Sequence, residues 1–146
     1  MAQTAKTRAE NEQLQDGDIV VLDLRELAEY KDSGPGVRIL SDTGASRVVL
    51  FTFKARQTLK EHTTSSQILV QTLRGSITFT AHEKSVRART GVLIELEARV
   101  PHSILAHTNA VVLVTMTPSP AHHTLEHEVF EKLTPLVVRA PETQDL

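Results

Sequence analysis

The chain has 146 residues, 40% of them hydrophobic and 23% charged, with a formal net charge of −2. This length corresponds to one ordinary domain with a sizeable core. Because phosphate backbones are bound by dense Lys and Arg surfaces, a nearly neutral chain gives no reason to expect a nucleic-acid partner. The absence of cysteine excludes disulfides, thiolate nucleophiles and cysteine-bound metals.

The first elements in chain order are a polar arm, a strand and a helix. Residues 1–17 lack the apolar core of a secretory signal and predict a flexible N-terminal arm. Residues 19–24 predict a short strand, and Asp23 followed by Glu26 predicts a capped helix over 24–30. No window approaches the ~18 consecutive apolar residues of a membrane span, so we expect a cytoplasmic protein without a membrane partner.

A series of short strands follows the first helix. Alternation of apolar and polar residues is the signature of a strand. In residues 76–81 it places Ile77 and Phe79 on one face and the polar residues between them on the other. Gly75 and Gly91 are typical of backbone turns between such strands. Many short strands at even spacing indicate a β-sandwich or a β-barrel. The predicted strands cover residues 36–40, 46–53, 67–73, 76–81, 85–89, 92–96 and 110–116.

The last part of the chain breaks the strand pattern. Residues 118–135 predict a helix that ends at Pro135, because apolar residues recur there at helical spacing. Residues 136–139 predict an edge strand that could pair within the barrel or with a second copy. The predicted organisation is an arm over 1–17, a β-barrel over 18–117, and a C-terminal helix and tail over 118–146.

Two stretches, residues 54–75 and 90–116, carry the most informative side chains. Each places one histidine, His62 or His102, at the edge of a strand-like run. Inward positions on separate strands of a barrel converge on its interior, so we expect the two imidazoles to meet there. An unperturbed imidazole titrates near ~6.5, which suits either an acid–base pair or metal ligands.

The first stretch resembles the first motif of the cupin superfamily. His62 matches the first histidine of that motif and Gly75 matches its closing glycine. The remaining motif positions differ: the opening glycine, second histidine and glutamate are replaced by Arg56, Thr64 and Ile68.

The second stretch resembles the second cupin motif. Gly91 and His102 match at the correct spacing, whereas the proline, glycine and asparagine positions hold Glu97, Arg99 and Ala106. The resemblance covers about residues 46–117. The sequences of these motifs are similar to those of small single-domain RmlC-like cupins with reduced metal motifs.

The resemblance implies an all-β, double-stranded β-helix (jelly-roll) barrel with short peripheral helices, and a homodimer. A complete cupin site supplies three histidines and one glutamate to a divalent metal, and this chain keeps two of these four ligands. His62 and His102 would therefore be the ligands of a zinc, iron, manganese or nickel ion. A weak site could be completed by Thr64, Gln67, Glu61 or Glu97.

Polar residues near the central strand could also contact a small molecule. If Thr64, Ile68, Val70 and Thr72 follow the parity of the motif, they face inward, whereas Gln71 faces outward. The predicted ligand-binding residues are His62, Thr64, Gln67, Thr72 and His102.

The remaining histidines favour a surface role. His107 falls on the opposite face of a strand continuing from His102, because an odd offset changes the side. On a helix, His123 and His127 would lie one turn apart, with His122 beside them, and could hold a metal. The HExxH order is absent, so a solvated helix face is the preferred interpretation.

Three functions are consistent with this sequence. The first is an enzyme, such as an isomerase, dioxygenase or decarboxylase, that uses His62 and His102 on a small molecule, with or without a weakly bound metal. The second is a module that binds or senses a small ligand without turnover. The third is a structural homodimer whose metal site has degenerated.

Overall fold

The computed structural model describes residues 12–14, 17–125, 130 and 133–139. Within them lie eleven strands and one short helix, α1 (Leu24–Leu27). The strands are β1 (Glu12–Leu14), β2 (Gly36–Asp42), β3 (Arg47–Phe53), β4 (Thr58–His62), β5 (Gln67–Arg74), β6 (Ser76–Ala81), β7 (Lys84–Arg89), β8 (Leu93–Leu96), β9 (His102–Ala106), β10 (Ala110–Thr117) and β11 (Val137–Arg139).

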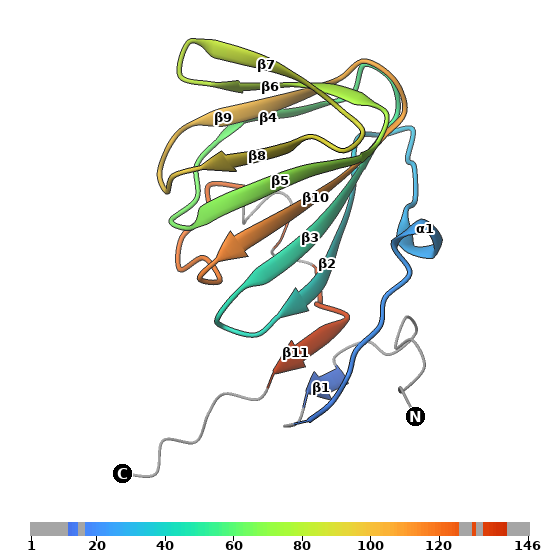
Figure 1. Ribbon diagram of the computed structural model, residues 1–146, viewed down its shortest axis with the longest axis vertical. Coiled ribbons are helices and arrows are strands. Elements are labelled where there is room, and N and C mark those ends of the chain that lie inside the picture. The colour runs from blue at the N-terminus through green and yellow to red at the C-terminus, as the bar shows by residue number, and fades with distance from the viewer. Residues whose placement is uncertain (1–11, 15–16, 126–129, 131–132, 140–146) are drawn as a thin grey trace.

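The strands form two sheets packed face to face (Figure 1). The larger sheet has the order β1-β11-β2-β3-β10-β5-β8, and the smaller has the order β4-β9-β6-β7. The predicted all-β jelly-roll architecture is therefore confirmed. The two sheets remain separate in their hydrogen bonding, rather than forming one continuous closed ladder.

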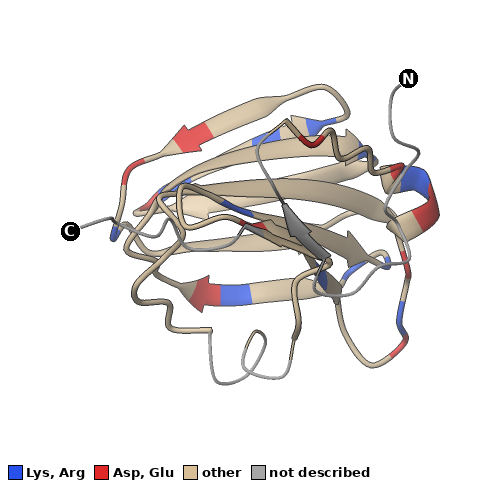
Figure 2. Cartoon of the chain, turned by 90° about the horizontal axis from the view of Figure 1, so that it is seen from below, with Lys and Arg blue, Asp and Glu red and all other residues tan. Residues whose placement is uncertain are grey.

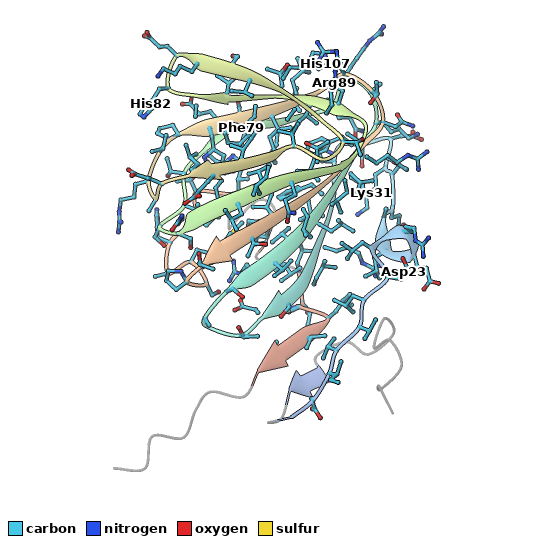
Figure 3. The ribbon with its side chains drawn as sticks, in the orientation of Figure 1. Asp23, Lys31, Phe79, His82, Arg89 and His107 are labelled. Carbon is cyan, nitrogen blue, oxygen red and sulfur yellow. The ribbon has the colours of Figure 1, made fainter. Side chains whose placement is uncertain are left out.

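The core between the sheets follows from strict alternation along the strands. On β5, Ile68, Val70 and Thr72 are buried while their neighbours are more exposed, as period-two geometry requires. On β6, Ile77 and Phe79 are buried in the same way, and Figure 3 shows Phe79 between the sheets. The predicted inward parity of these strands is therefore confirmed.

The segment before β2 behaves differently from the sequence-based prediction. Residues 19–23 form no strand. Instead, Val20 and Leu22 pack with the buried Leu27 of α1 against a second hydrophobic cluster that includes Leu50 of β3. Helix α1 is present where predicted, though shorter, and the Asp23 side chain caps it by accepting a hydrogen bond from the Arg25 N–H.

Both ends of the chain add strands to the large sheet. The strand predicted over residues 136–139 is found as β11, which pairs in parallel with β2. It is not an edge strand, because β1 lies on its other side. β1 pairs in parallel with β11, so residues 12–14 form a strand where a flexible arm was predicted. The other arm residues, 1–11 and 15–16, lie outside the described residues.

The predicted C-terminal helix is not found over residues 118–125. This stretch contains turns and an isolated antiparallel bridge between His123 and Thr64. Pro118 and Pro120 oppose a helix here, because proline removes a backbone donor and restricts the residue before it. The remainder of the predicted helix falls largely on residues 126–129 and 131–132, outside the described residues.

Charged residues are interspersed rather than gathered by sign, as Figure 2 shows for the described chain. This distribution matches the small net charge of −2. In the described part of the chain, no helix has the length and apolar character needed to cross a membrane.

Candidate functional site

His62 and His102 lie directly opposite each other on neighbouring strands of the small sheet. They are register partners of the antiparallel pair β4–β9. Their ring centroids are 4.1 Å apart in an edge-on arrangement, and their residues are only 7% and 4% exposed. The structure thus brings together the two imidazoles that the sequence analysis expected to meet.

Different local geometries point the two rings inward. On β9, simple alternation buries His102, Ile104 and Ala106. On β4, Leu59 and His62 are both buried although their separation is odd. A register shift between these two residues, of the kind that a β-bulge produces, accounts for this by changing the side that His62 faces.

A third histidine joins the pair from the C-terminal segment. His123 is 3% exposed, and its ring stacks on that of His62 with centroids 5.3 Å apart. Backbone hydrogen bonds hold this segment beside the chain that follows β4: Ser65 donates to the His122 carbonyl at 2.9 Å and Thr124 donates to the Thr63 carbonyl at 3.1 Å.

The C-terminal segment covers the histidines with apolar side chains. Leu125 and Phe130 belong to the main core cluster, and the Phe130 ring meets the His123 ring edge-on at 4.7 Å. The buried Ser66 hydroxyl donates to the Pro118 carbonyl at 2.6 Å, which fixes the start of the segment. Residues 118–125 therefore seal the interior beside His62 and His102.

A small cavity lies among the three rings. The volume open to the centre of a water molecule is about 10 Å³, which is roughly the space that one water requires. Its polar lining consists of His62, His102, His123 and Thr64, and its apolar lining of Phe51, Leu59, Ile68, Val70, Phe79, Ile104, Val114 and Met116.

Burial keeps the three imidazoles neutral. Loss of hydration, reinforced by the neighbouring His102, lowers the pKa of His62 to about 4. Burial also lowers the pKa of His102, against opposing effects of the Val100 carbonyl and Glu61. The pKa of His123 falls to about 3, because burial acts together with His62 and His102. Near neutral pH the cluster therefore carries no charge.

The other predicted ligand-binding residues divide into three cases. Thr64 is buried and lines the cavity. Thr72 is buried, but its hydroxyl points at the Ala88 carbonyl and it does not line the cavity. Gln67 does not line the cavity, because its side chain is exposed and bonded to Glu95 on the outer face. β5 alternates, so a residue next to the inward Ile68 faces outward.

The His62 and His102 rings have a nitrogen lone pair available to bind a metal, whereas the His123 ring differs in its hydrogen bonding. Nδ1 of His62 and Nδ1 of His102 donate to the carbonyls of Lys60 and Val100 at 2.7 and 2.8 Å. Each ring therefore keeps its lone pair on Nε2, as metal-bound histidines do. In contrast, Nδ1 of His123 accepts the Leu125 N–H at 3.0 Å.

No carboxylate completes this set. Glu61 and Glu97, the two acidic candidates, are exposed. In the described residues no group of three or more His, Cys, Asp or Glu side chains is arranged to hold a metal ion. Since zinc sites generally need at least three protein ligands, these residues do not fit a resident divalent metal.

Three other histidines that the sequence singled out, His107, His122 and His127, lie apart from the cluster or outside the described residues. His122 is exposed beside the buried His123. His107 is half-buried and its Nε2 contacts the Thr78 hydroxyl at the rim of the small sheet, at the upper right of Figure 3. His127 lies outside the described residues, so the proposed pairing with His123 on a helix stays untested.

Sequence reasoning missed the role of His123 because it placed this residue on a solvated helix. A signal was available: His123 and Leu125 are two residues apart, the spacing that buries both in an extended segment. The neighbouring Pro118 and Pro120 also favour an extended chain over a helix.

Comparison with solved structures places this geometry in a known fold. An RmlC-like cupin from Desulfovibrio desulfuricans superposes with a TM-score of 0.65 at 25% identity, over 69% of this chain and 98% of that one. The chain is a member of the cupin superfamily. Neither a protein-family model nor a curated protein sequence matches it.

Two further solved structures show the range of proteins with a similar fold. A cupin superfamily protein from Desulfitobacterium hafniense matches with a TM-score of 0.62 at 17% identity, over 74% of this chain and 96% of that one. Salicylate 1,2-dioxygenase from Pseudoaminobacter salicylatoxidans matches with a TM-score of 0.56 at 13% identity, over 64% of this chain and 30% of the enzyme. At these identities the likeness concerns the fold alone, because one fold hosts many activities.

Proposed function

We propose that this cupin binds a small molecule in its interior, with His62 and His102 as the principal polar contacts. The observation that carries the proposal is the pair of buried imidazoles in a mostly apolar cavity. Burying two polar rings costs stability unless their hydrogen-bonding groups are satisfied. Each ring has one nitrogen bonded to the backbone and one remaining for a ligand.

The size of the cavity adds a condition to this proposal. Space for about one water molecule is too small for a metabolite. Residues 118–125 seal the interior through a few backbone and hydroxyl hydrogen bonds. A ligand larger than water would therefore enter only when this segment shifts and the cavity widens.

Thermal unfolding with a panel of small metabolites tests the proposal. A ligand that binds only the folded protein adds about 2.7 kcal/mol at a concentration 100 times its Kd. We expect one compound to raise the thermal midpoint of the wild type and to have no effect on His62→Leu or His102→Leu.

Thr72→Val is the matched control, because it removes a buried hydroxyl that does not line the cavity. This variant should retain the response to the ligand. A panel without any stabilising compound, or a response that survives in both histidine variants, would contradict the proposal.

Metal analysis of the purified protein addresses the predicted zinc, iron, manganese or nickel. Two available imidazole nitrogens fall short of the usual three protein ligands, so binding of the small molecule does not depend on a metal in this proposal. Stoichiometric metal that disappears in both His62→Leu and His102→Leu would instead favour a metal-dependent site.

A further inference from the structure

The hydrogen bonds of the three rings define which chemical groups the cavity can accept. A backbone carbonyl only accepts, so Nδ1 of His62 and Nδ1 of His102 carry protons, and both Nε2 atoms are acceptors. A backbone N–H only donates, so Nδ1 of His123 is unprotonated in its bond with Leu125. A neutral His123 ring must then carry its proton on Nε2.

The cluster therefore combines two hydrogen-bond acceptors with one donor. A water molecule matches this set, because it can donate two hydrogen bonds and accept one. The open volume of about 10 Å³ also corresponds to one water, and buried waters typically make about three hydrogen bonds to protein.

Charged ligands match the cluster less well. A divalent cation would meet the Nε2–H of His123, and the positive charge of Arg47 acts on the same ring. A carboxylate would meet the lone pairs of His62 and His102, which repel it. A neutral hydroxyl avoids both conflicts, since it can donate to one of these rings while accepting from His123.

We propose that His62, His102 and His123 form a binding site for a neutral hydroxyl group, occupied by water in the free protein and by an alcohol hydroxyl of the small molecule when bound. This inference rests on the proposed function and specifies its ligand class. It also assigns His123 as the donor, a role fixed by the Leu125 N–H.

Nitrogen NMR of the full-length protein tests the proton positions directly. In a ¹⁵N-labelled sample near neutral pH, long-range ¹H–¹⁵N correlations distinguish protonated from unprotonated ring nitrogens. We expect His62 and His102 to carry the proton on Nδ1 and His123 to carry it on Nε2. Each ring is assigned by its His→Gln variant, or by through-bond backbone correlations where a variant does not fold. A proton on Nδ1 of His123 would overturn the inference.

Three small probes then test the ligand class. Methanol should shift the ring nitrogens saturably in the wild type and in Thr72→Val, but not in His123→Phe. Formate and zinc chloride should produce no saturable shift. Saturable shifts with formate or zinc, or no response to methanol, would overturn the hydroxyl assignment. A metabolite that still stabilises the protein through His62 and His102 would leave the proposed function standing in that case.

Discussion

At the scale of single residues, His122 and His123 are adjacent in sequence but opposite in environment. The His123 ring is buried against His62 and Phe130, whereas His122 is exposed. The Leu125 N–H also depends on His123 for its hydrogen bond. The two neighbours therefore form a natural pair for separating burial from local sequence effects.

We predict that His123→Ala lowers the free energy of unfolding by about 2–3 kcal/mol, because it leaves a cavity and an unpaired backbone donor. His122→Ala should change it by less than about 0.5 kcal/mol, as is usual for a surface position. Urea titration of both variants measures the difference. Equal effects would show that His123 is not packed as described.

Stability should also depend on pH through the buried histidines. The folded-state pKa of His62 is about 4 and that of His123 about 3, both below the ordinary histidine pKa of 6.5. Well above pH 6.5 both histidines are neutral in the folded protein and in the unfolded chain. They then add no pH dependence to the free energy of unfolding. As the pH falls from 6.5 toward 4, the unfolded chain takes up protons that the folded protein does not, so stability falls.

The expected slope is up to about 1.4 kcal/mol per pH unit for each of these histidines. Urea titrations at several pH values in this window measure it. His62→Leu should show a shallower slope than the wild type, since one titrating group is removed. Identical slopes would mean that His62 is protonated as readily in the folded protein as in the unfolded chain.

At the scale of elements, turns and register shifts decide where side chains point. Gly75 and Gly91 lie at the predicted backbone turns, and both have positive φ, +83° and +93°. Their surroundings differ. A Cβ added to Gly75 would lie 2.2 Å from the Asn109 carbonyl oxygen, whereas one added to Gly91 would have no atom within 4 Å.

We therefore predict that Gly91→Ala costs about 1–2 kcal/mol, from the left-handed backbone alone. Gly75→Ala should cost at least about 1 kcal/mol more, because the β5–β6 turn must also move away from the β9–β10 loop. Thermal or urea unfolding compares the two variants. A Gly75→Ala protein as stable as Gly91→Ala would show that this close approach relaxes without cost.

Two strands that carry site residues, β4 and β9, were absent from the predicted strands. β4 has an irregular register, so its apolar pattern lacks period two. β9 is short and follows the Val100–Pro101 pair, which resembles a loop in sequence. Their pairing partners lie far apart in the chain, and only the assembled sheet supplies the hydrogen bonds that make them strands.

At the scale of the whole molecule, part of the large sheet remains uncovered on its outer face. Residues 20–30 pack over β3 and β10, but Leu73 on β5 and Leu93 on β8 are 37% and 57% exposed. Strand β8 also forms an open edge of this sheet. Exposed apolar residues beside an open edge are typical of an association surface.

We propose that the predicted homodimer forms through this surface. Analytical ultracentrifugation should show a dimer that dissociates on Leu93→Lys, because a charge would be buried between the copies. Val86→Lys, at an exposed apolar position on β7 of the other sheet, is the matched control and should remain dimeric. A wild-type protein that is monomeric at all concentrations would contradict the proposal.

The sequence by itself determined the all-β class, seven of the main strands and the inward positions of Ile68, Val70 and Thr72. These features depend on alternation between near neighbours, which is visible in any stretch of chain. The spacing of the His62 and His102 motifs also predicted a meeting of the two rings through their resemblance to cupins.

Only the tertiary structure decided that His123 completes the cluster. Its segment is positioned by hydrogen bonds to residues 57 to 61 positions away. Neither local propensity nor motif spacing encodes such a contact. The protons on the three rings depend on backbone groups only two residues away in the chain, but the folded backbone conformation is what directs those groups at the imidazoles.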